Sequence, residues 1–417
     1  MKFFVESYGC TLNQGEGVEF HDRLRALGHE PVSSSDEAEL VVLNTCTVIE
    51  STQLKILKRL ENLHRCSKKI IVSGCMAAVQ TDDIREIAPD VTILMPRDYY
   101  RFEEIIETNY GRIAVEGAPC DKKTTAIIPI AQGCLGNCSY CITKLARGNL
   151  RSYEPEKIVE KVRKSLEMGA REILLTAQDS AAYGIDIGLT LRDLLAKIVS
   201  IERDFRIRIG MMNPESLQKI LDDVLEIWGN EKVYKFFHIP VQSGSDRILT
   251  LMRRGYTVDQ FKTQLNTIRH VFPELSLSTD VITGFPGETE ADHRATVALI
   301  KDIEPNILNV TRFSPRPGTI AASMMPRVPS WVSKNRSREL TKLRFDISER
   351  NYQSKIGAVE EILITEHGKS GTMIGRTNAY VPVVVKEQIE LGMFAKVQII
   401  GAARTHLYGE VIDRRSP

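Results

Sequence analysis

The sequence of 417 residues predicts an α/β protein built from three parts. These are a small open parallel α/β domain, a larger partial (β/α)6 barrel and a small all-β barrel at the C-terminus. Three observations predict this fold class. Short apolar runs alternate with segments of helical periodicity as far as Arg350. Six strand–helix units fall in the central part, short of the eight that close a full barrel. After Gly357 the pattern changes to short strands separated by glycine-containing turns. The predicted domain boundaries are 1–118, 119–352 and 353–417.

Composition limits the class of protein. Hydrophobic residues make up 42% and charged residues 26% of the chain, as in ordinary globular proteins with a sizeable core. No apolar run approaches the roughly 18–20 residues of a membrane-spanning helix, and residues 1–7 resemble a strand rather than a signal peptide. We therefore expect a cytoplasmic protein without a membrane partner. The formal net charge is only +1, so a nucleic-acid site requires local basic patches.

The N-terminal domain shows a β-α-β-α pattern, which predicts a small open parallel sheet. The expected strands are 2–5, 40–43, 69–72 and 91–94. The expected helices are 16–27, 51–63 and 81–87.

Three cysteines follow the first three of these strands. Cys10, Cys46 and Cys75 each lie a few residues past a strand end. Because the carboxyl ends of parallel strands gather at one edge of a sheet, we expect these thiols to form one three-thiolate site. The alternative is three independent core cysteines. Cys66 and Cys120 do not follow the pattern, and we predict that neither is a ligand. The wide spacing of all eight cysteines argues against a disulfide framework.

A second group of cysteines opens the central domain. Cys134, Cys138 and Cys141 have the spacing C-x3-C-x2-C, just after the apolar run 126–131. Three thiolates on one short loop can bind a four-iron cubane and leave one iron open to a small molecule. The alternative is a zinc knuckle, which requires a fourth ligand nearby. The next histidine after the loop is His238.

The central domain continues the strand–helix alternation on a larger scale. The expected strands are 126–131, 172–176, 206–211, 236–241, 275–282 and 307–313. The expected helices include 155–168, 189–201, 214–228, 258–271 and 288–303. Polar residues and glycine follow the strands, which is where such folds bind ligands.

The cysteine loop, with Tyr140 before its last cysteine, resembles the signature of the radical S-adenosylmethionine (SAM) enzymes. This resemblance implies a [4Fe–4S] cluster whose open iron binds the amino and carboxylate groups of SAM. It also implies that an electron from the cluster splits SAM to give a 5′-deoxyadenosyl radical.

The N-terminal cysteine motifs narrow the resemblance to the methylthiotransferases, a branch of that superfamily. Gly9-Cys10-x-x-Asn13, Asn44-Thr-Cys46 and Gly74-Cys75 are similar to the motifs that hold an auxiliary [4Fe–4S] cluster in this branch. Residues 8–16 most resemble the archaeal and eukaryotic subgroup. That subgroup thiomethylates N6-threonylcarbamoyladenosine (t6A), the tRNA base just 3′ of the anticodon. Residues 76–78, Met-Ala-Ala, differ from the Leu-Ala-Gln of many relatives.

By the same resemblance, residues at the strand ends of the central domain line the SAM pocket. They are Tyr140, Gln178, Gln242, Ser243, Gly284 and Gly287. Glycines allow the backbone to approach an adenosyl group, and amide side chains can bridge ribose and carboxylate. The alternative for each is a turn or a helix cap. We do not predict that His238 is a ligand, because it is equally consistent with a satisfied buried histidine.

Several basic residues are candidates for RNA contact. Arg147 and Arg151, just after the cysteine loop, are expected to bind an RNA phosphate or the SAM carboxylate, unless they are solvated surface arginines. The pattern of residues 333–355 predicts a basic amphipathic helix. Its basic side chains either form a solvated face or contact RNA phosphates. The C-terminal strands 360–365, 380–385 and 395–400, with the segment 371–376, resemble the TRAM RNA-binding module. Lys369, Arg376, Tyr380 and Arg404 are its expected RNA contacts.

The resemblance implies methylthiolation of C2 of t6A in tRNA, with two [4Fe–4S] clusters and SAM as cofactors. The implied partners are the anticodon loop of ANN-decoding tRNAs and an electron donor such as flavodoxin or ferredoxin. Related alternatives are methylthiolation of a ribosomal-protein aspartate or of isopentenyladenosine in tRNA. An alternative of another class is a non-catalytic iron–sulfur RNA-binding protein. The absence of a fourth cysteine in either group argues against that last alternative.

Overall fold

The computed structural model describes residues 1–111 and 123–415. The chain forms two compact units. The first consists of Met1–Asp121, Ala131–Arg151 and Ser314–Ala322, and the second of Lys122–Ile130, Ser152–Phe313 and Ser323–Pro417. The three predicted domains are thus grouped differently. The cysteine loop belongs with the N-terminal residues, and the C-terminal barrel belongs with the central strands.

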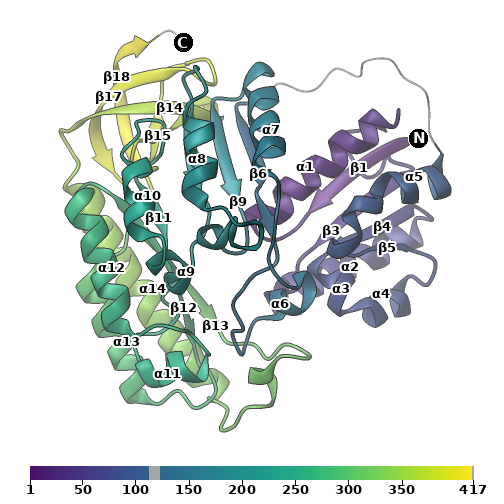
Figure 1. The fold of residues 1–417 in the computed structure, drawn as a ribbon, viewed down its shortest axis with the longest axis horizontal. Helices are drawn as coiled ribbons and strands as arrows, with labels where there is room; N and C mark the ends of the chain where they lie inside the picture. The colour runs from purple at the N-terminus through teal and green to yellow at the C-terminus, as the bar shows by residue number, and fades with distance from the viewer. Residues whose placement is uncertain (112–122, 416–417) are drawn as a thin grey trace. The chain divides into compact units, whose positions relative to one another are not determined.

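The first unit contains a five-stranded parallel sheet in the order β2-β1-β3-β4-β5 (Figure 1). Its strands are β1 (Lys2–Ser7), β2 (Glu30–Pro31), β3 (Leu40–Thr45), β4 (Lys69–Gly74) and β5 (Thr92–Leu94). The four predicted strands are confirmed. The two-residue β2 is an addition, too short to produce a hydrophobic pattern.

Helices cover both faces of this sheet. They are α1 (Thr11–Ala26), α2 (Glu50–Arg65), α3 (Cys75–Val79), α4 (Thr81–Ile87), η1 (Pro96–Arg101), α5 (Phe102–Tyr110) and α6 (Ile142–Arg147). On one face, Phe20 of α1 and Phe102 of α5 pack in a core with Val42 of β3. On the other face, Ile56 of α2 packs in a second core with Val41. Burial on both faces explains why β3 is a continuous apolar run.

The second unit contains an open half-barrel of six parallel strands, in two sheets with the orders β10-β9-β6 and β11-β12-β13. The strands are β6 (Thr125–Pro129), β9 (Glu172–Thr176), β10 (Arg206–Ile209), β11 (Phe236–His238), β12 (Ser276–Thr283) and β13 (Ile307–Arg312). A parallel bridge between Ile207 of β10 and Val233, just before β11, connects the two sheets. The predicted partial barrel is confirmed. The short strands β7 (Ala131–Gln132) and β8 (Arg151–Ser152) flank the cysteine loop.

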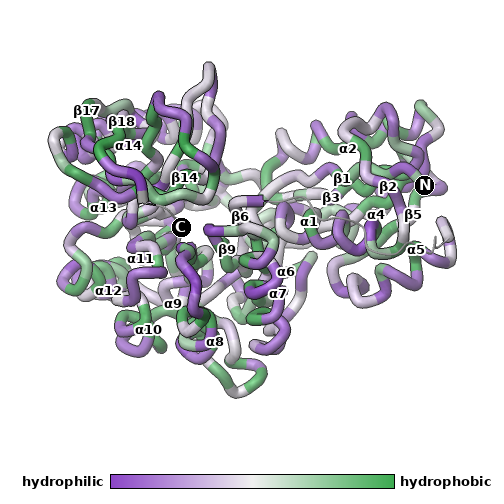
Figure 2. The backbone as a smooth tube through the Cα atoms, turned by 90° about the horizontal axis from the view of Figure 1, so that it is seen from above, coloured by the Kyte–Doolittle hydropathy of each residue, from purple (hydrophilic) through white to green (hydrophobic). Residues whose placement is uncertain are grey.

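Amphipathic helices cover the half-barrel, and hydrophobic and hydrophilic residues alternate along them (Figure 2). They are α7 (Pro155–Glu167), α8 (Leu191–Val199), α9 (Pro214–Gln218), α10 (Leu221–Trp228), α11 (Asp246–Leu251), α12 (Val258–Val271), α13 (Glu290–Ile303) and α14 (Ser330–Gln353). The short turns η2 (Ser180–Ala182), η3 (Ile185–Ile187) and η4 (Ile320–Ser323) lie between them. The helix predicted over 214–228 is two helices, because Ile220 leaves the helical conformation at φ −127°. Within the described ranges, no helix is long and apolar enough to cross a membrane.

The C-terminal strands close into a small barrel in the order β14-β15-β16-β18-β17. The strands are β14 (Val359–His367), β15 (Met373–Thr377), β16 (Pro382–Val385), β17 (Phe394–Ala402) and β18 (Leu407–Arg415), with the turn η5 (Lys369–Gly371). Ile362, Val383, Val397 and Leu407 pack in its core. The sequence pattern did not predict β18, which pairs with β16 and β17 and completes the closure.

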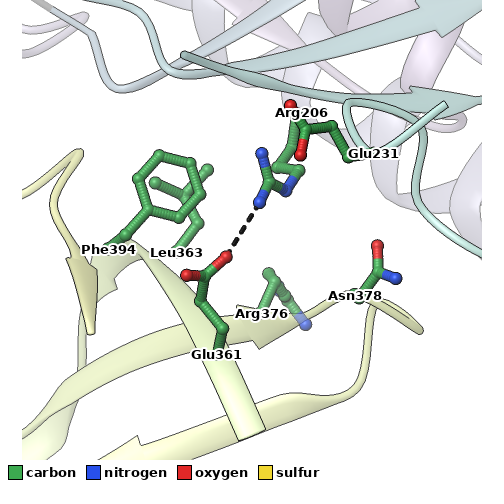
Figure 3. A pocket seen from close by; sticks show the side chains of 7 residues that line it. All are labelled: Arg206, Glu231, Glu361, Leu363, Arg376, Asn378 and Phe394. Atoms are coloured by element: carbon green, nitrogen blue, oxygen red, sulfur yellow. Dashed lines mark hydrogen bonds and ion pairs between the residues drawn. The ribbon is translucent and has the colours of Figure 1, made fainter. Parts of the chain in front are cut away.

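The small barrel packs on the first residues of the half-barrel strands. The ring of Tyr380 lies 4.9 Å from the ring of Tyr234 and 5.2 Å from that of Phe236. The backbone N–H of Lys235 donates to the carbonyl of Asn378 at 2.8 Å. A cavity of about 250 Å³ lies at this junction, where Arg206 pairs with Glu361 at 3.0 Å (Figure 3). This packing explains why half-barrel and small barrel form one unit.

Candidate functional site

The first cysteine trio lies at the carboxyl ends of three neighbouring strands. Cys10 directly precedes α1 and follows β1, Cys46 follows β3, and Cys75 is the first residue of α3 after β4. Strands β1, β3 and β4 are adjacent in the sheet. The topology therefore gathers at one sheet edge three thiols that are far apart in sequence.

The loops that carry the trio are held close together. Gly9 has φ +102°, and a Cβ atom there would lie 2.6 Å from Cβ of Cys46, so only glycine fits. Asn13 donates its amide N–H groups to the carbonyls of Tyr8 at 2.8 Å and Thr45 at 2.9 Å. The glycine and asparagine of the first motif thus join the loops after β1 and β3.

Burial changes the acidity of these thiols. Burial raises the pKa of the Cys46 thiol and raises the pKa of Cys75 to about 11, and the nearby Cys10 contributes to both increases. The two buried groups are therefore protonated near neutral pH until a metal displaces the proton. Once deprotonated, thiolate sulfur is a soft ligand, and soft ligands suit an iron–sulfur cluster.

Arg147 occupies a different place from the one predicted. It is the last residue of α6, which begins directly after Cys141, and its side chain is fully buried. Both Nη atoms pair with the carboxylate of Glu16, with Nη2 to Oε2 at 2.8 Å, and Nη2 also donates to Oδ1 of Asn13 at 2.8 Å. Its Nε donates to Sγ of Cys75 at 3.3 Å. Because this side chain is 0% exposed, Arg147 is neither a solvated surface arginine nor open to an RNA phosphate. The residue instead links the segment after the second trio to the first trio.

Glu16 also belongs to this group of buried residues, although it was not among the residues predicted from the sequence. Its side chain is 4% exposed. Burial by itself would lower the pKa of Arg147, but the charges around it, that of Glu16 foremost, together raise this pKa above its ordinary value. A usable signal was present in the sequence. Asn13 and Glu16 are spaced by three on the helix that starts after Cys10, which places both on one face.

The second trio lies on the loop between β7 and β8. The backbone N–H of Gly136 donates to Sγ of Cys134 at 3.2 Å, and that of Cys141 donates to the carbonyl of Cys138 at 3.2 Å. Burial raises the pKa of the Cys141 thiol, and Cys138 adds to the rise. The backbone N–H of Ala321 donates to the carbonyl of Ser139 at 2.8 Å, so residues 314–322 help to hold this loop.

Neither trio is arranged as a mononuclear site. Within residues 1–111 and 123–415, no three Cys, His, Asp or Glu side chains are placed to hold a metal ion together. A zinc knuckle requires such a placement. A cubane does not, because each thiolate binds a different iron. Cys66 lies before β4, at the opposite end of the sheet from the first trio, and is exposed. Cys120 lies outside the described residues.

A second buried arginine lies beside the first trio. Arg316 is 5% exposed and donates from Nη1 to Oε1 of Gln53 at 2.6 Å. Its Nε and Nη2 atoms are buried and have no hydrogen-bond partner among the described residues. The positive charge of Arg316 acts on the Cys46 thiol, lowering its pKa against the effect of burial.

Among the residues predicted to bind SAM, Gln178 fits a polar ligand best. It follows β9, and its Oε1 atom is buried without a partner among the described residues. An unsatisfied buried acceptor suits an amino or hydroxyl group of a cofactor. Gln242 has φ +70°, and its backbone bonds to Asp280 and Ile282 at 2.8 and 3.0 Å.

The hydroxyl of Ser243 is engaged within the protein. It accepts from the backbone N–H of Ser245 at 3.2 Å and lies 3.4 Å from the hydroxyl of Thr296 on α13. Ser245 in turn donates to Asp292 at 2.6 Å. In this structure the serines of the loop anchor the backbone around Gln242 to α13.

The glycines 284 and 287 have a packing role that the sequence did not indicate. A Cβ atom on Gly284, at φ +74°, would lie 2.6 Å from Cβ of Ser333 at the start of α14. The backbone N–H of Gly284 donates to Glu288 at 2.7 Å, and that of Gly287 donates to the carbonyl of Pro326 at 2.8 Å. A close approach to α14 is therefore enough to require glycine at 284, and its contact with SAM stays a prediction.

His238 forms a hydrogen bond within the protein through one of its ring nitrogens. Its Nε2 lies 2.6 Å from Oδ2 of Asp280, whose Oδ1 accepts from the amide of Asn309 at 2.9 Å. These three polar side chains come from β11, β12 and β13. They lie on the strand face opposite the buried positions Leu277 and Val281.

Two of the predicted RNA contacts, Tyr380 and Arg376, also take part in the packing of the small barrel. Tyr380 is packed among aromatic rings, and the guanidinium groups of Arg208 and Arg376 lie 5.1 and 4.9 Å from its ring centre. Arg376 donates to Glu366 at 2.7 Å. These contacts leave Tyr380 partly buried, and its contact with RNA stays a prediction. The exposed Arg151, Lys369 and Arg404 remain predicted contacts.

Helix α14 carries a basic groove next to the small barrel. A cavity of about 450 Å³ is lined by Ser337, Arg338, Thr341, Lys342, Phe345, Asp346 and Arg404. Arg338, Lys342 and Arg404 are exposed, and the side chain of Arg404 is 61% accessible. Arg336 does not belong to this surface, because it is buried and pairs with Glu288 at 2.7 Å.

Comparison with known proteins places the chain in a family. Three family models match: the Radical SAM superfamily over residues 128–300, the uncharacterized protein family UPF0004 over residues 2–96 and the TRAM domain over residues 353–412. A probable threonylcarbamoyladenosine tRNA methylthiotransferase of Pyrococcus horikoshii is 41% identical over 427 residues, covering 99% of this chain and 100% of the relative. The chain belongs to this methylthiotransferase family.

The family extends to eukaryotes. Threonylcarbamoyladenosine tRNA methylthiotransferases of Drosophila melanogaster and Homo sapiens are 34% and 32% identical, covering 99% of this chain and 78% and 74% of their own lengths. The resemblance predicted from the cysteine motifs is confirmed.

Solved structures share the fold at low identity. The radical SAM methyltransferase TsrM of Kitasatospora setae, with cobalamin and a [4Fe–4S] cluster bound, has a TM-score of 0.52 at 14% identity, covering 73% of this chain and 68% of its own. The cobalamin-dependent radical SAM enzyme OxsB has a TM-score of 0.53 at 11% identity, covering 77% and 54%. These matches support the fold class of this methylthiotransferase family member.

Proposed function

We propose that this protein transfers a methylthio group to C2 of N6-threonylcarbamoyladenosine in tRNA, at the base just 3′ of the anticodon. The observation that carries the proposal is the presence of two separate cysteine trios within one compact unit, linked by Arg147. Relatives named for this activity match nearly the whole chain.

The two trios suit two [4Fe–4S] clusters with different tasks. Cys134, Cys138 and Cys141 would hold the cluster that binds SAM, and Cys10, Cys46 and Cys75 would hold an auxiliary cluster that carries sulfur. When bound, these cofactors supply the radical that removes the C2 hydrogen and the sulfur that replaces it. Such chemistry is needed because an aromatic C–H bond offers no acidic proton and no leaving group.

The protein's own residues bind and orient SAM and the substrate base. Gln178, with its unpaired Oε1, and the backbone around Gln242 are the proposed contacts of SAM in the second unit. The substrate base is in a single-stranded loop, so turning it into a pocket costs little free energy. The proposed partners are ANN-decoding tRNAs and a flavodoxin or ferredoxin as electron donor. We place the reaction in the cytoplasm, where widely spaced cysteines remain reduced.

We propose the basic groove on α14 as a contact for the tRNA backbone. Arg338, Lys342 and Arg404 offer three exposed cations around a single cavity, and Phe345 is the aromatic residue beside them. Basic groups with an interleaved aromatic ring are typical of surfaces that bind RNA phosphates and bases.

The decisive experiment is anaerobic reconstitution with tRNA that carries t6A. We expect both 5′-deoxyadenosine and the 2-methylthio nucleoside by mass spectrometry. The triple variant Cys10→Ala/Cys46→Ala/Cys75→Ala should still cleave SAM but should form no methylthio product. If the triple variant still delivers sulfur, the division of tasks between the trios is wrong.

The same assay separates the alternatives. Product on tRNA with isopentenyladenosine, or on a ribosomal-protein aspartate, but not on t6A would replace the proposed substrate. Iron and sulfide without any 5′-deoxyadenosine would favour a non-catalytic RNA-binding protein.

Salt-dependent binding tests the groove. The double variant Arg338→Ala/Lys342→Ala should weaken tRNA binding, and should reduce the slope of log K against log salt by roughly 0.7–0.9 for each phosphate that the protein no longer neutralises. The control Arg163→Ala/Lys164→Ala removes two exposed cations from α7 in the same unit and should leave the slope unchanged. Equal slopes in the two variants would exclude the groove.

A further inference from the structure

Arg316 is held firmly beside the first cysteine trio. The backbone N–H and the hydroxyl of Thr319 bond to its carbonyl at 3.1 and 2.8 Å and fix the turn that carries it. Gln53 on α2 accepts from Nη1 at 2.6 Å. One end of the guanidinium is therefore anchored.

The other edge of the guanidinium is unused. Nε and Nη2 are buried, and no described residue accepts from either. These two atoms form the edge that binds a carboxylate through two parallel hydrogen bonds. Leaving charged donors buried and unpaired costs free energy, so this arrangement indicates a place for an anionic ligand.

Comparison with Arg147 supports this interpretation. Both arginines are buried near the trio, and both act on the Cys46 thiol. Arg147 is neutralised by Glu16, which is 4% exposed. Arg316 is close enough to Glu50 to feel its charge, but its Nε and Nη2 atoms bond to no carboxylate in the described chain. The uncompensated arginine is the one available to a ligand.

We propose that Arg316 forms a carboxylate-binding subsite whose occupant is the threonyl carboxylate of the substrate base. This inference rests on the proposed function. A threonylcarbamoyl group ends in a free carboxylate, which unmodified adenine and isopentenyladenine lack. C2 of the base must reach sulfur held by Cys10, Cys46 and Cys75. The carboxylate of the same base is then in range of a cation next to Cys46, so Arg316 determines specificity.

The test compares two forms of one tRNA, with t6A and with unmodified adenine, against the reconstituted holoenzyme. Wild type should bind the t6A form more tightly. Arg316→Gln should weaken binding of that form by about 10- to 100-fold, as expected when a charged hydrogen-bond pair is removed, and should abolish the preference. Arg316→Lys keeps the positive charge but cannot donate two parallel hydrogen bonds, so this variant should retain part of the preference. The KM for t6A-tRNA should rise more than kcat falls.

Two controls show whether an effect on tRNA binding is specific to Arg316. Arg85→Gln removes an exposed cation from α4 of the same unit and should change nothing. Iron content and melting temperature show whether each variant is folded and loaded. Should Arg316→Gln fail to load iron, the Arg316→Lys variant decides the question alone.

Three results would overturn the proposal. The first is an unchanged preference for t6A-tRNA. The second is a raised KM for SAM in 5′-deoxyadenosine formation without tRNA, which would assign the subsite to the SAM carboxylate. The third is a reduction potential of the auxiliary cluster that shifts in Arg316→Gln while the preference for t6A-tRNA stays unchanged, which would assign Arg316 to the cluster. Absence of methylthio product from wild type would instead contradict the proposed function, since binding preference is measured separately.

Discussion

At the scale of single residues, the main feature of the site is a buried ion pair. Arg147 and Glu16 are 0% and 4% exposed in their side chains and lie 131 positions apart in the sequence. Their pairing holds the segment after the second trio against the sheet edge that carries the first. Removing one partner of such a pair leaves the other charge buried without compensation.

We therefore expect Glu16→Gln to lower the free energy of unfolding by about 3–5 kcal/mol. The double variant Glu16→Leu/Arg147→Met should recover most of this loss, because no charge remains buried. Urea unfolding of the metal-free protein under reducing conditions measures both.

The exposed pair Arg101–Glu104 of the same unit, 2.8 Å apart, is the matched control. Glu104→Gln should leave the urea midpoint almost unchanged, because solvent screens a surface pair. A double variant as unstable as Glu16→Gln alone would show that packing, rather than charge, explains the loss.

The two cysteine trios, which remain predicted ligands, are visible in the sequence, whereas the buried arginines beside them are not. Cysteine spacing and position after each strand are local features, so both trios could be predicted from the chain. Arg147 and Arg316 derive their roles from Glu16 and Gln53, which are distant in sequence. Nothing local distinguishes them from surface arginines, and the expected phosphate contact of Arg147 was wrong for that reason.

At the scale of elements, hydrophobic periodicity located strands and helices well. Strand β9 and helices α4 and α12 have the predicted bounds. The exceptions have physical causes. Strand β2 has two residues, too few for a pattern, and the helix predicted over 214–228 is interrupted at Ile220. Strand β18 is defined by its pairing with two other strands, which the sequence does not show.

The start of α13 gives a prediction about pH. Asp292 accepts from the backbone N–H and the hydroxyl of Thr289, from Ser245 at 2.6 Å, and from Arg247. Burial alone would raise the pKa of Asp292, but these hydrogen bonds outweigh it and hold the pKa below its usual 3.8. The unfolded chain therefore binds more protons at low pH. This contribution to stability is present above about pH 4 and is lost as the pH falls.

We expect Asp292→Asn to destabilise the metal-free protein by about 1.5–3 kcal/mol at neutral pH, and the difference from wild type to shrink as the pH falls below about 4. Urea midpoints measured from pH 7 to pH 3 check this. The capping box of α12, formed by Thr257 and Gln260, is uncharged. Thr257→Ala should therefore cost about 1 kcal/mol at every pH. A constant penalty for Asp292→Asn across the range would contradict the argument.

At the scale of the whole molecule, the small barrel is bound to the half-barrel rather than tethered to it. Tyr380 contacts Tyr234 and Phe236, and Arg208 lies over the rings of both Phe236 and Tyr380. Glu172, at the start of β9, accepts from the hydroxyl of Tyr234 at 3.0 Å. A module packed in this way cannot move independently, so the small barrel has a fixed position relative to the half-barrel strands within the second unit.

The packing at this junction predicts how the second unit unfolds. Tyr380→Ala removes a large ring from a packed junction and should cost about 3–5 kcal/mol, as large-to-small core substitutions do. Because Arg208 is then left without one of its aromatic partners, the small barrel should separate from the half-barrel before either unfolds. We expect calorimetry to show an additional, lower-temperature transition in the variant. Tyr408→Ala, at a ring 43% exposed on the same barrel, should leave the transitions unchanged. Unchanged melting of the Tyr380 variant would mean that the junction contributes little and that the small barrel behaves as an independent module.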